Sequence, residues 1–190
     1  MNQTIYTNIC LGSKFDHPAH LIAVNSIAQL RPMVANAGVA RLASLMDMTN
    51  EEWRVTQSVN LDGTMYCYKN AAIQMIKQGH GGRIIGASSA VGKRGFTNAS
   101  AYSATKFAIR GLTQSAALDL QRHNITVNAY APGLIETPLV SGGQVPEILG
   151  HPMLSAKPDV VAALVAYLVK PEAYFITGQS ISINGGLYFD

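Results

Sequence analysis

Tyr102 and Lys106 are the pair of residues in this sequence whose types and spacing suggest chemistry. They stand four residues apart in ASAYSATKFAIRG (99–111), so a helix would place both side chains on one face. A free tyrosine, with a pKa of about 10, is a poor base at neutral pH, and a nearby ammonium favours its phenolate. The pair therefore suggests a phenol that exchanges protons with a substrate, although an exposed pair without function has the same spacing.

Short apolar runs alternate with helical patterns from residue 31 onward, and these elements must position the pair. Buried strands are expected at four places: 32–36, 83–88, 125–130 and 178–185. Helices are expected over three longer stretches: 49–77, 100–122 and 159–169. The first opens at Thr49 and Glu52, which have the spacing of a capping box, and the third lies between Pro158 and Pro171.

The alternation of continuously apolar strands with helices is typical of a parallel sheet covered on both faces. The predicted fold class is therefore α/β, with three layers. Ligands bind beyond the carboxyl ends of the strands in such sheets. Small and polar residues follow three of the expected strands, in the segments NAG, SSAVG and APG. We expect these three strand ends to face one crevice.

The composition excludes several classes of function. Of the 190 residues, 48% are hydrophobic and 13% are charged, which is typical of a compact globule and not of a disordered chain. The formal net charge of +3 comes without a basic stripe, so no nucleic-acid partner is expected. No apolar run is long enough to cross a membrane, and the histidines lack the neighbours of a metal site. Two cysteines and no signal-peptide pattern lead us to expect a cytoplasmic protein.

Six motifs in sequence order resemble the short-chain dehydrogenase/reductase family: NAG (36–38), VNLDG (59–63), SSAVG (88–92), YSATK (102–106), PGLIETP (132–138) and TGQSISINGG (177–186). The resemblance runs from about Leu21 to Asp190, and the nearest branch is that of the acetoin/diacetyl (butanediol) reductases. It implies a Rossmann-like fold and an NAD(P)-dependent interconversion of a secondary alcohol and a ketone. It also implies a homodimer or homotetramer formed through the helices at 51–77 and 100–122.

The resemblance implies a role for each of four catalytic residues. Tyr102 is the acid/base, Ser89 positions the substrate, and Lys106 tunes Tyr102 and holds the nicotinamide ribose. Asn60 matches the asparagine that holds a water in the family's proton relay. Ser89 fits the family spacing better than Ser88, and adjacent strand residues point opposite ways, so we expect Ser88 to face the packing side.

NAD or NADP is the implied cofactor, and the residue that would select between them has no counterpart in this sequence. Tyr102 and Lys106 match family positions at the nicotinamide ribose. The other matching positions are Asn36, Ala37 and Gly38, which pass beneath the cofactor, and Pro132, Gly133, Ile135 and Thr137, which surround its amide and phosphates.

The N-terminal side of the chain departs from the family. Family members begin with a strand and T-G-x-x-x-G-[IL]-G at a helix N-terminus, where the backbone approaches the pyrophosphate. Residues 1–20 do not match this pattern, and we interpret them as an atypical leader before a truncated domain at 21–190. The retained strands form the nicotinamide and substrate half, which leaves the strand at 32–36 as an unpaired edge. Residues 4–11 favour strand formation and either pair with that edge or remain unstructured.

Two functions are compatible with this pattern. The first is an oxidoreductase acting on a small alcohol or ketone. The alternative is a truncated isoform that binds cofactor poorly and acts, if at all, by assembling with full-length subunits. Lys93 and Arg94 follow SSAVG and could meet an anionic substrate, but we favour a solvated turn for both.

Overall fold

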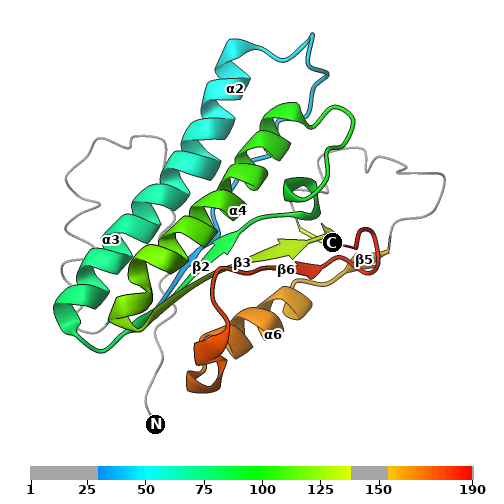
Figure 1. Cartoon of the computed structure of the whole chain (residues 1–190). Coiled ribbons are helices and arrows are strands. Elements are labelled where there is room, and N and C mark those ends of the chain that lie inside the picture. The colour runs from blue at the N-terminus through cyan, green and yellow to red at the C-terminus, as the bar shows by residue number, and fades with distance from the viewer. Residues whose placement is uncertain (1–29, 138–153, 190) are drawn as a thin grey trace.

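The computed structural model describes residues 30–137 and 154–189 and shows a four-stranded parallel sheet (Figure 1). The strands, in spatial order, are β1 (Pro32–Ala35), β2 (Gly82–Ala87), β3 (Ile125–Pro132) and β6 (Ser180–Ile183). They lie within two residues of the predicted ranges. Every pairing is parallel, so all four carboxyl ends meet at one edge of the sheet.

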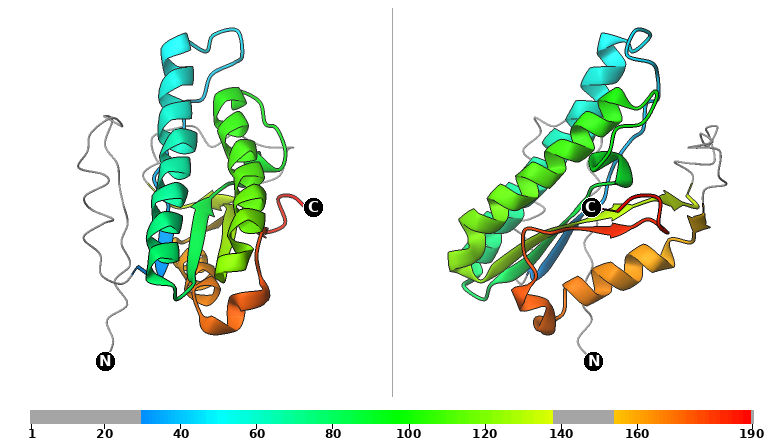
Figure 2. Two further views of the ribbon diagram at one scale, coloured as in Figure 1. Left: turned by 60° about the vertical axis from the view of Figure 1, so that its left-hand side comes forward. Right: turned by 45° about the vertical axis from the view of Figure 1, so that its right-hand side comes forward.

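Helices cover both faces of this sheet. One face carries α2 (Asn50–Gln57), the π-helical turn η1 (Ser58–Asp62), α3 (Gly63–Gln78) and α4 (Ser100–Leu120). The other face carries α6 (Asp159–Leu168), and Figure 2 shows the sheet between the two groups of helices. The three-layer α/β arrangement predicted from the sequence is confirmed.

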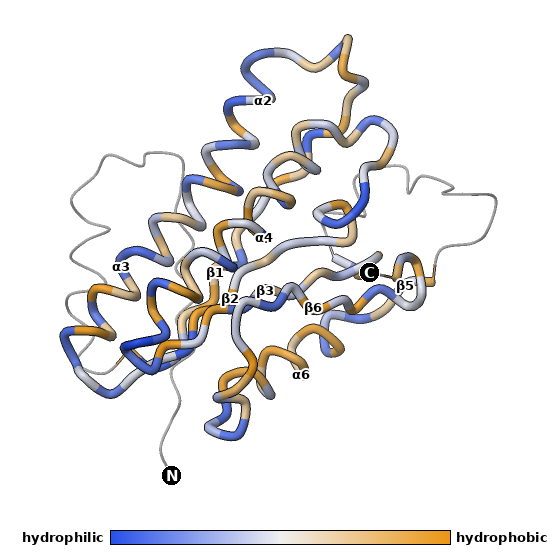
Figure 3. The backbone as a smooth tube through the Cα atoms, in the orientation of Figure 1, coloured by the Kyte–Doolittle hydropathy of each residue, from blue (hydrophilic) through white to orange (hydrophobic). Residues whose placement is uncertain are grey.

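Two hydrophobic clusters fill the spaces between these layers. Ile84 and Ile85, adjacent on β2, point to opposite faces because side chains alternate along a strand. Ile84 joins the larger cluster beneath α3 and α4, and Ile85 joins the smaller cluster above α6. Figure 3 shows the matching apolar colour along β1, β2 and α6. Predominantly apolar strands are typical of a sheet that is covered on both faces.

The first predicted helix begins as the sequence indicated but is not one continuous α-helix. Thr49 is the N-cap, and its hydroxyl accepts from the Glu52 amide while the Glu52 carboxylate accepts from the Thr49 amide. The helix widens into the π turn at Ser58–Asp62 before α3 continues it. At the end of α3, Gly79 has a φ of 72°, a left-handed conformation that glycine adopts without steric cost.

Short elements complete the chain. The segment after β3 contains β4 (Leu134–Ile135), which pairs with β5 (Ser155–Ala156) in a separate two-stranded parallel sheet. The sequence did not predict this pair. Single 3-10 turns occur at η2 (Ala90–Gly92), η3 (Gln121–His123) and η4 (Pro171–Phe175).

Within the described residues, β1 pairs with β2 alone and lies at the edge of the sheet. The Gln78 side chain anchors the chain as it enters this strand. Its Oε1 accepts from the Leu30 amide at 2.8 Å, and its Nε2 donates to the Leu30 carbonyl at 2.8 Å. The predicted pairing of residues 4–11, and the predicted leader at 1–20, lie outside the described residues.

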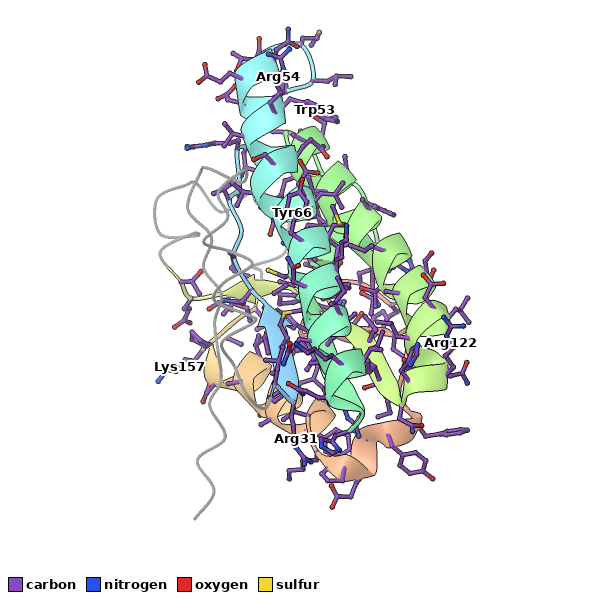
Figure 4. All side chains as sticks on the ribbon, turned by 90° about the vertical axis from the view of Figure 1, so that its left-hand side faces the viewer. Arg31, Trp53, Arg54, Tyr66, Arg122 and Lys157 are labelled. Carbon is purple, nitrogen blue, oxygen red and sulfur yellow. The ribbon has the colours of Figure 1, made fainter. Side chains whose placement is uncertain are left out.

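The rod formed by α2, η1 and α3 extends beyond the sheet. Figure 4 shows Trp53 and Arg54 at its far end, with Arg31 at the opposite end beside β1. Trp53 and Tyr66 are partly exposed along the rod. In the parts of the chain that the structure describes, no helix has the length and hydrophobicity that crossing a membrane would need.

Candidate active site

The carboxyl ends of β1, β2 and β3 bring the predicted site residues to one edge of the sheet. The register places Ala35 opposite Gly86 and Ala87 opposite Tyr130. Beyond these pairs lie the NAG segment after β1, Ser88 and Ser89 after β2, and Gly133 after β3. This is the convergence that the sequence predicted.

Ser88 and Ser89 face different surroundings. The Ser88 hydroxyl donates to the main-chain carbonyl of Lys106 at 3.0 Å, so this side chain packs against α4. The Ser89 hydroxyl accepts from the Val91 amide at 3.3 Å and also shares a hydrogen bond with the Tyr102 phenol. Ser89 therefore lies beside the candidate acid/base, while Ser88 faces the packing side.

Gly92 allows α4 to approach the turn after β2 closely. A Cβ on Gly92 would lie 2.6 Å from the Lys106 carbonyl and 2.6 Å from the Ser88 hydroxyl, which no side chain can accommodate. The close approach fixes the first turns of α4 against the end of β2. It thereby sets the positions of Tyr102 and Lys106 relative to Ser89.

Tyr102 and Lys106 are one turn apart on α4; Lys106 is buried and Tyr102 is partly buried. The Lys106 ammonium donates to the Ala87 carbonyl at 2.7 Å and lies 5.4 Å from the centroid of the Tyr102 ring. Burial lowers the pKa of Lys106 to about 8, because a desolvated ammonium is disfavoured. The two side chains therefore lie side by side, as their spacing on one helix face predicted.

Burial raises the pKa of Tyr102 above its ordinary value, because the phenolate loses its hydration. The hydrogen bond with Ser89 acts in the opposite direction and is the smaller effect. The sequence led us to expect a pKa lowered by Lys106. In the structure desolvation dominates, and the phenol is the favoured form at neutral pH.

Asn60 lies in the π turn and is fully buried. Its Oδ1 accepts from the Val39 amide at 2.8 Å, and its Nδ2 donates to the Val39 carbonyl at 2.9 Å and to the Thr105 hydroxyl at 3.2 Å. A Cβ on Gly38 would lie 3.3 Å from Asn60 Oδ1 and 3.5 Å from Lys106 Nζ. Gly38, Asn60 and Lys106 therefore border the same small space.

Tyr130 and Thr105 have roles at the site that the sequence did not predict. The Tyr130 hydroxyl donates to Asn36 Oδ1 and connects the end of β3 to the NAG segment. Burial raises the pKa of Tyr130, so this hydroxyl keeps its proton. A phenol near the carboxyl end of a buried strand was the available signal for Tyr130. For Thr105, the signal was a hydroxyl three residues after Tyr102 on the same helix.

The loop after β3 holds the remaining predicted cofactor positions. Pro132 ends β3, and the Gly133 amide donates to the Ile183 carbonyl at 3.0 Å. A Cβ on Gly133 would lie 3.0 Å from the main chain of Asn184, so a larger residue here would require the two strand ends to shift apart by a few tenths of an ångström. Ile135 lies in β4, and Thr137 is the last described residue before 154.

The turn after Ser89 differs from the expectation at one of its two basic residues. Lys93 is buried, and its ammonium donates to the Ser182 hydroxyl on β6 at 2.9 Å. The solvated turn that we favoured is therefore wrong for Lys93. Its ammonium is buried because it binds Ser182, a residue distant in sequence. Arg94 is exposed, and its guanidinium lies 5.8 Å from the centroid of the Phe96 ring.

Comparison with known proteins identifies the family. A family model described as enoyl-(acyl carrier protein) reductase matches residues 21–188. A short-chain dehydrogenase/reductase of Armillaria gallica is 45% identical over 181 residues, covering 88% of this chain and 69% of the relative. The chain belongs to the short-chain dehydrogenase/reductase family.

Other members of the family have more specific names. A diacetyl reductase [(S)-acetoin forming] of Staphylococcus aureus is 36% identical over 173 residues, covering 83% of this chain and 67% of that protein. The crystal structure of an acetoin dehydrogenase from Salmonella typhimurium superposes with a TM-score of 0.78 at 34% identity, covering 91% of this chain and 72% of that one. This short-chain dehydrogenase/reductase thus spans about two thirds of the length of its curated relatives.

Membership confirms three predictions made from the sequence. The Rossmann-like α/β fold is that of the family. The protein is an oxidoreductase of the class that acts on CH–OH groups, with NAD or NADP as the cofactor class. The roles of the individual site residues stay predictions.

Proposed function

We propose that this short-chain dehydrogenase/reductase interconverts a secondary alcohol and a ketone, with Tyr102 as the acid/base. One observation carries the proposal: the partly buried phenol of Tyr102 is hydrogen-bonded to the Ser89 hydroxyl and lies under the Lys106 ammonium. Such a cluster combines a proton donor, a group that can hold a carbonyl oxygen and a positive charge.

The proton is exchanged at the Tyr102 hydroxyl in both directions. In reduction, the phenol gives its proton to the carbonyl oxygen while a hydride reaches the carbonyl carbon, and the product is an alcohol. In oxidation, the phenolate accepts the proton of the alcohol. Lys106 favours the phenolate while its own ammonium is charged, which is the case below its pKa of about 8. Ser89 holds the substrate oxygen within reach of the phenol.

The nicotinamide of NAD or NADP supplies or accepts the hydride when it is bound. Gly38 leaves room on the β1 side, because the Cβ of any larger residue would crowd Asn60 Oδ1. Asn36 and Gly38 are exposed at the strand end, where a cofactor could lie over them. We infer that these residues, Ala37 and Lys106 hold the ribose side. The loop containing Pro132, Gly133, Ile135 and Thr137 would hold the amide and the adjacent phosphate.

The proposed substrates are small diketones and hydroxyketones. The names of two relatives support this class: the diacetyl reductase of Staphylococcus aureus and the acetoin dehydrogenase of Salmonella typhimurium. Lys93 is bonded to Ser182, which gives no support to an anionic substrate at that lysine.

The test is turnover of diacetyl and acetoin by the purified chain with NADH, NADPH and their oxidised forms. A parallel fluorescence titration measures binding of NADH and NADPH. We expect saturable binding of at least one nucleotide and oxidation of it by diacetyl. Absence of binding at about millimolar nucleotide would overturn the proposal for this chain.

A second candidate function rests on the β1 side of the molecule. Among the described residues β1 pairs with β2 alone, and the chain spans about two thirds of its curated relatives. The β1 edge of the described sheet is the observation behind this alternative, a member that binds cofactor poorly and acts by assembling with full-length subunits. Nucleotide binding that appears only after mixing with a full-length relative would support this function over the first.

Self-association through α3 and α4 is part of the proposal. Both helices carry apolar side chains that are partly or largely exposed in the single chain: Tyr66, Ile73, Ile76, Phe107 and Leu118. A homodimer or homotetramer would cover them, as exposed apolar patches on helices commonly mark interfaces. Sedimentation equilibrium distinguishes these states from a monomer. The cytoplasmic location expected from the sequence stays a prediction.

A further inference from the structure

The hydrogen bonds of Asn60 leave its amide a single orientation. Both Nδ2 hydrogens are used, one on the Val39 carbonyl and one on the Thr105 hydroxyl, and Oδ1 accepts from the Val39 amide. The side chain is fully buried, so no water can replace a lost partner at its surface. A reversed amide would face the Val39 amide with a donor and the Val39 carbonyl with an acceptor.

The Thr105 hydroxyl can only accept from Asn60. Its one hydrogen is donated to the main-chain carbonyl of Tyr102 at 2.8 Å. A hydroxyl has one donor hydrogen and two acceptor lone pairs, so the side facing Asn60 is an acceptor. Thr105 is fully buried and therefore cannot exchange these partners for solvent. It distinguishes the NH₂ end of the Asn60 amide from its oxygen end.

These bonds link three separate segments of the site. Val39 follows the NAG segment, Asn60 lies in the π turn, and Thr105 and Tyr102 lie in the first turns of α4. The orientation of the amide also decides which of its atoms faces the space beside the Lys106 ammonium. Asn60 Oδ1 and Lys106 Nζ both lie within 3.5 Å of the point where a Cβ on Gly38 would sit. An oxygen in that space favours a neighbouring ammonium, whereas an NH₂ group would repel it.

We propose that Thr105 is a positioning residue for the proton-transfer site, acting through Asn60 on Lys106 and on the loop after β1. The inference rests on the proposed function, because it assigns Thr105 a task in that reaction. Thr105 does not touch the reacting atoms in this account. Its hydroxyl, together with the main chain of Val39, holds the Asn60 amide with its oxygen towards the space that Lys106 borders.

Thr105→Val removes the hydroxyl and keeps the shape of the side chain. Thr105→Ser keeps the hydroxyl. The matched control is Thr113→Val, on the same helix and equally buried, where the lost partner is the Tyr68 hydroxyl at 3.0 Å. Both valine variants leave a buried polar group unpaired, but only Thr105 is bonded to Asn60.

The first readout is turnover of diacetyl with the nucleotide that binds. We expect Thr105→Val to lower kcat about tenfold with KM for diacetyl unchanged within about twofold, as for loss of an interaction realised in the transition state. Thr105→Ser should restore kcat to within about threefold of the natural protein. Thr113→Val should lower the thermal midpoint to a similar extent as Thr105→Val while keeping kcat. An equal fall in kcat for both valine variants would overturn the proposal.

The second readout does not depend on turnover. Hydrogen exchange at the Val39 amide reports on its bond to Asn60 Oδ1, and Thr105→Val should speed this exchange while Thr113→Val should not. Unchanged protection of Val39 in Thr105→Val would overturn the proposal whatever the kinetics. If the natural protein fails to turn over, the proposed function fails, and the exchange result still decides the coupling. Thr105→Ala replaces Thr105→Val should the latter not fold, with the same expected outcomes.

Discussion

The carboxyl ends of β1 and β2 are neighbours in one sheet, yet their surroundings differ. After β2, the Ser88 hydroxyl is bonded to the Lys106 carbonyl and the Lys106 ammonium to the Ala87 carbonyl, all within a buried region. After β1, Asn36 and Gly38 are exposed. The side-chain bonds to this segment come from other elements, namely Tyr130 on β3 and Asn60 in the π turn.

This difference between the two strand ends shows which part of the site is held in place by its own residues. The proposed proton transfer uses groups at the end of β2 and on α4, and those two elements hold each other in place through buried hydrogen bonds. The segment after β1 would lie against a cofactor. It is held by hydrogen bonds from Tyr130 on β3 and Asn60 in the π turn. Substitutions near β2 and α4 should therefore remove chemistry, whereas those near β1 should weaken nucleotide binding.

The largest effect is expected for Tyr102→Phe on α4, which removes the phenol hydroxyl that would exchange the proton. We expect kcat for diacetyl reduction to fall about a thousandfold, since positioned acid/base groups contribute factors of about 10² to 10⁴. The dissociation constant of the nucleotide should change by less than about fivefold. Steady-state kinetics and a fluorescence titration measure the two quantities. Full turnover in this variant would remove Tyr102 from the acid/base role.

The adjacent serines provide the next test. Ser89→Ala should lower kcat about a hundredfold, because a donor beside the reacting oxygen is lost. Ser88→Ala loses only the bond to the Lys106 carbonyl, which is worth about 1 kcal/mol of stability. Kinetics and urea unfolding of both variants separate the two outcomes. A larger loss of kcat in Ser88→Ala would reverse the assignment.

The third prediction concerns how the free energy of unfolding depends on pH with and without Lys106. Burial lowers its pKa from the ordinary lysine value of 10.5 to about 8, so between these values the unfolded chain binds more protons here than the folded one. The free energy of unfolding should therefore rise with pH across this window, by about 3 kcal/mol relative to Lys106→Met. The destabilisation is complete below pH 8 and is relieved by about pH 10.5. Urea unfolding of both proteins from pH 7 to 10.5 measures it, and parallel curves would contradict the burial of the ammonium.

The smallest effect is expected for Gly38→Ala on the β1 side. The added Cβ would lie 3.3 Å from Asn60 Oδ1, which must then move by a few tenths of an ångström, and 3.5 Å from Lys106 Nζ, which is an ordinary contact. We expect nucleotide affinity to fall about threefold to tenfold, equivalent to about 1 kcal/mol. Gly95→Ala is the control, because its added Cβ meets no atom within 4 Å. Equal affinity in the two variants would show that Gly38 is not at the nucleotide.

Patterns that depend on neighbouring residues were predictable from the sequence. The apolar strands, the capping box of Thr49 with Glu52 and the helical spacing of Tyr102 and Lys106 are local features, and the structure contains each of them. The parallel order of the sheet followed from their alternation. The motif order then identified the family.

Features set by distant partners were not predictable. Lys93 is buried because Ser182 meets it from a strand 89 residues away. The raised pKa of Tyr102 depends on how completely α4 is covered, which no spacing reveals. The bond of Asn60 to Thr105 crosses 45 residues, and the two-stranded sheet of β4 and β5 joins segments about 20 residues apart.

The π turn has a consequence for how the long helical rod can meet another helix. Each α-helical residue advances about 100° around the axis, and a π turn advances by less per residue. The side chains of α3 are therefore rotated about the helix axis relative to where an unbroken α-helix from α2 would place them. The axis itself continues through Ser58–Asp62. A straight helix laid along the rod can stay in phase with one of these two segments but not with both.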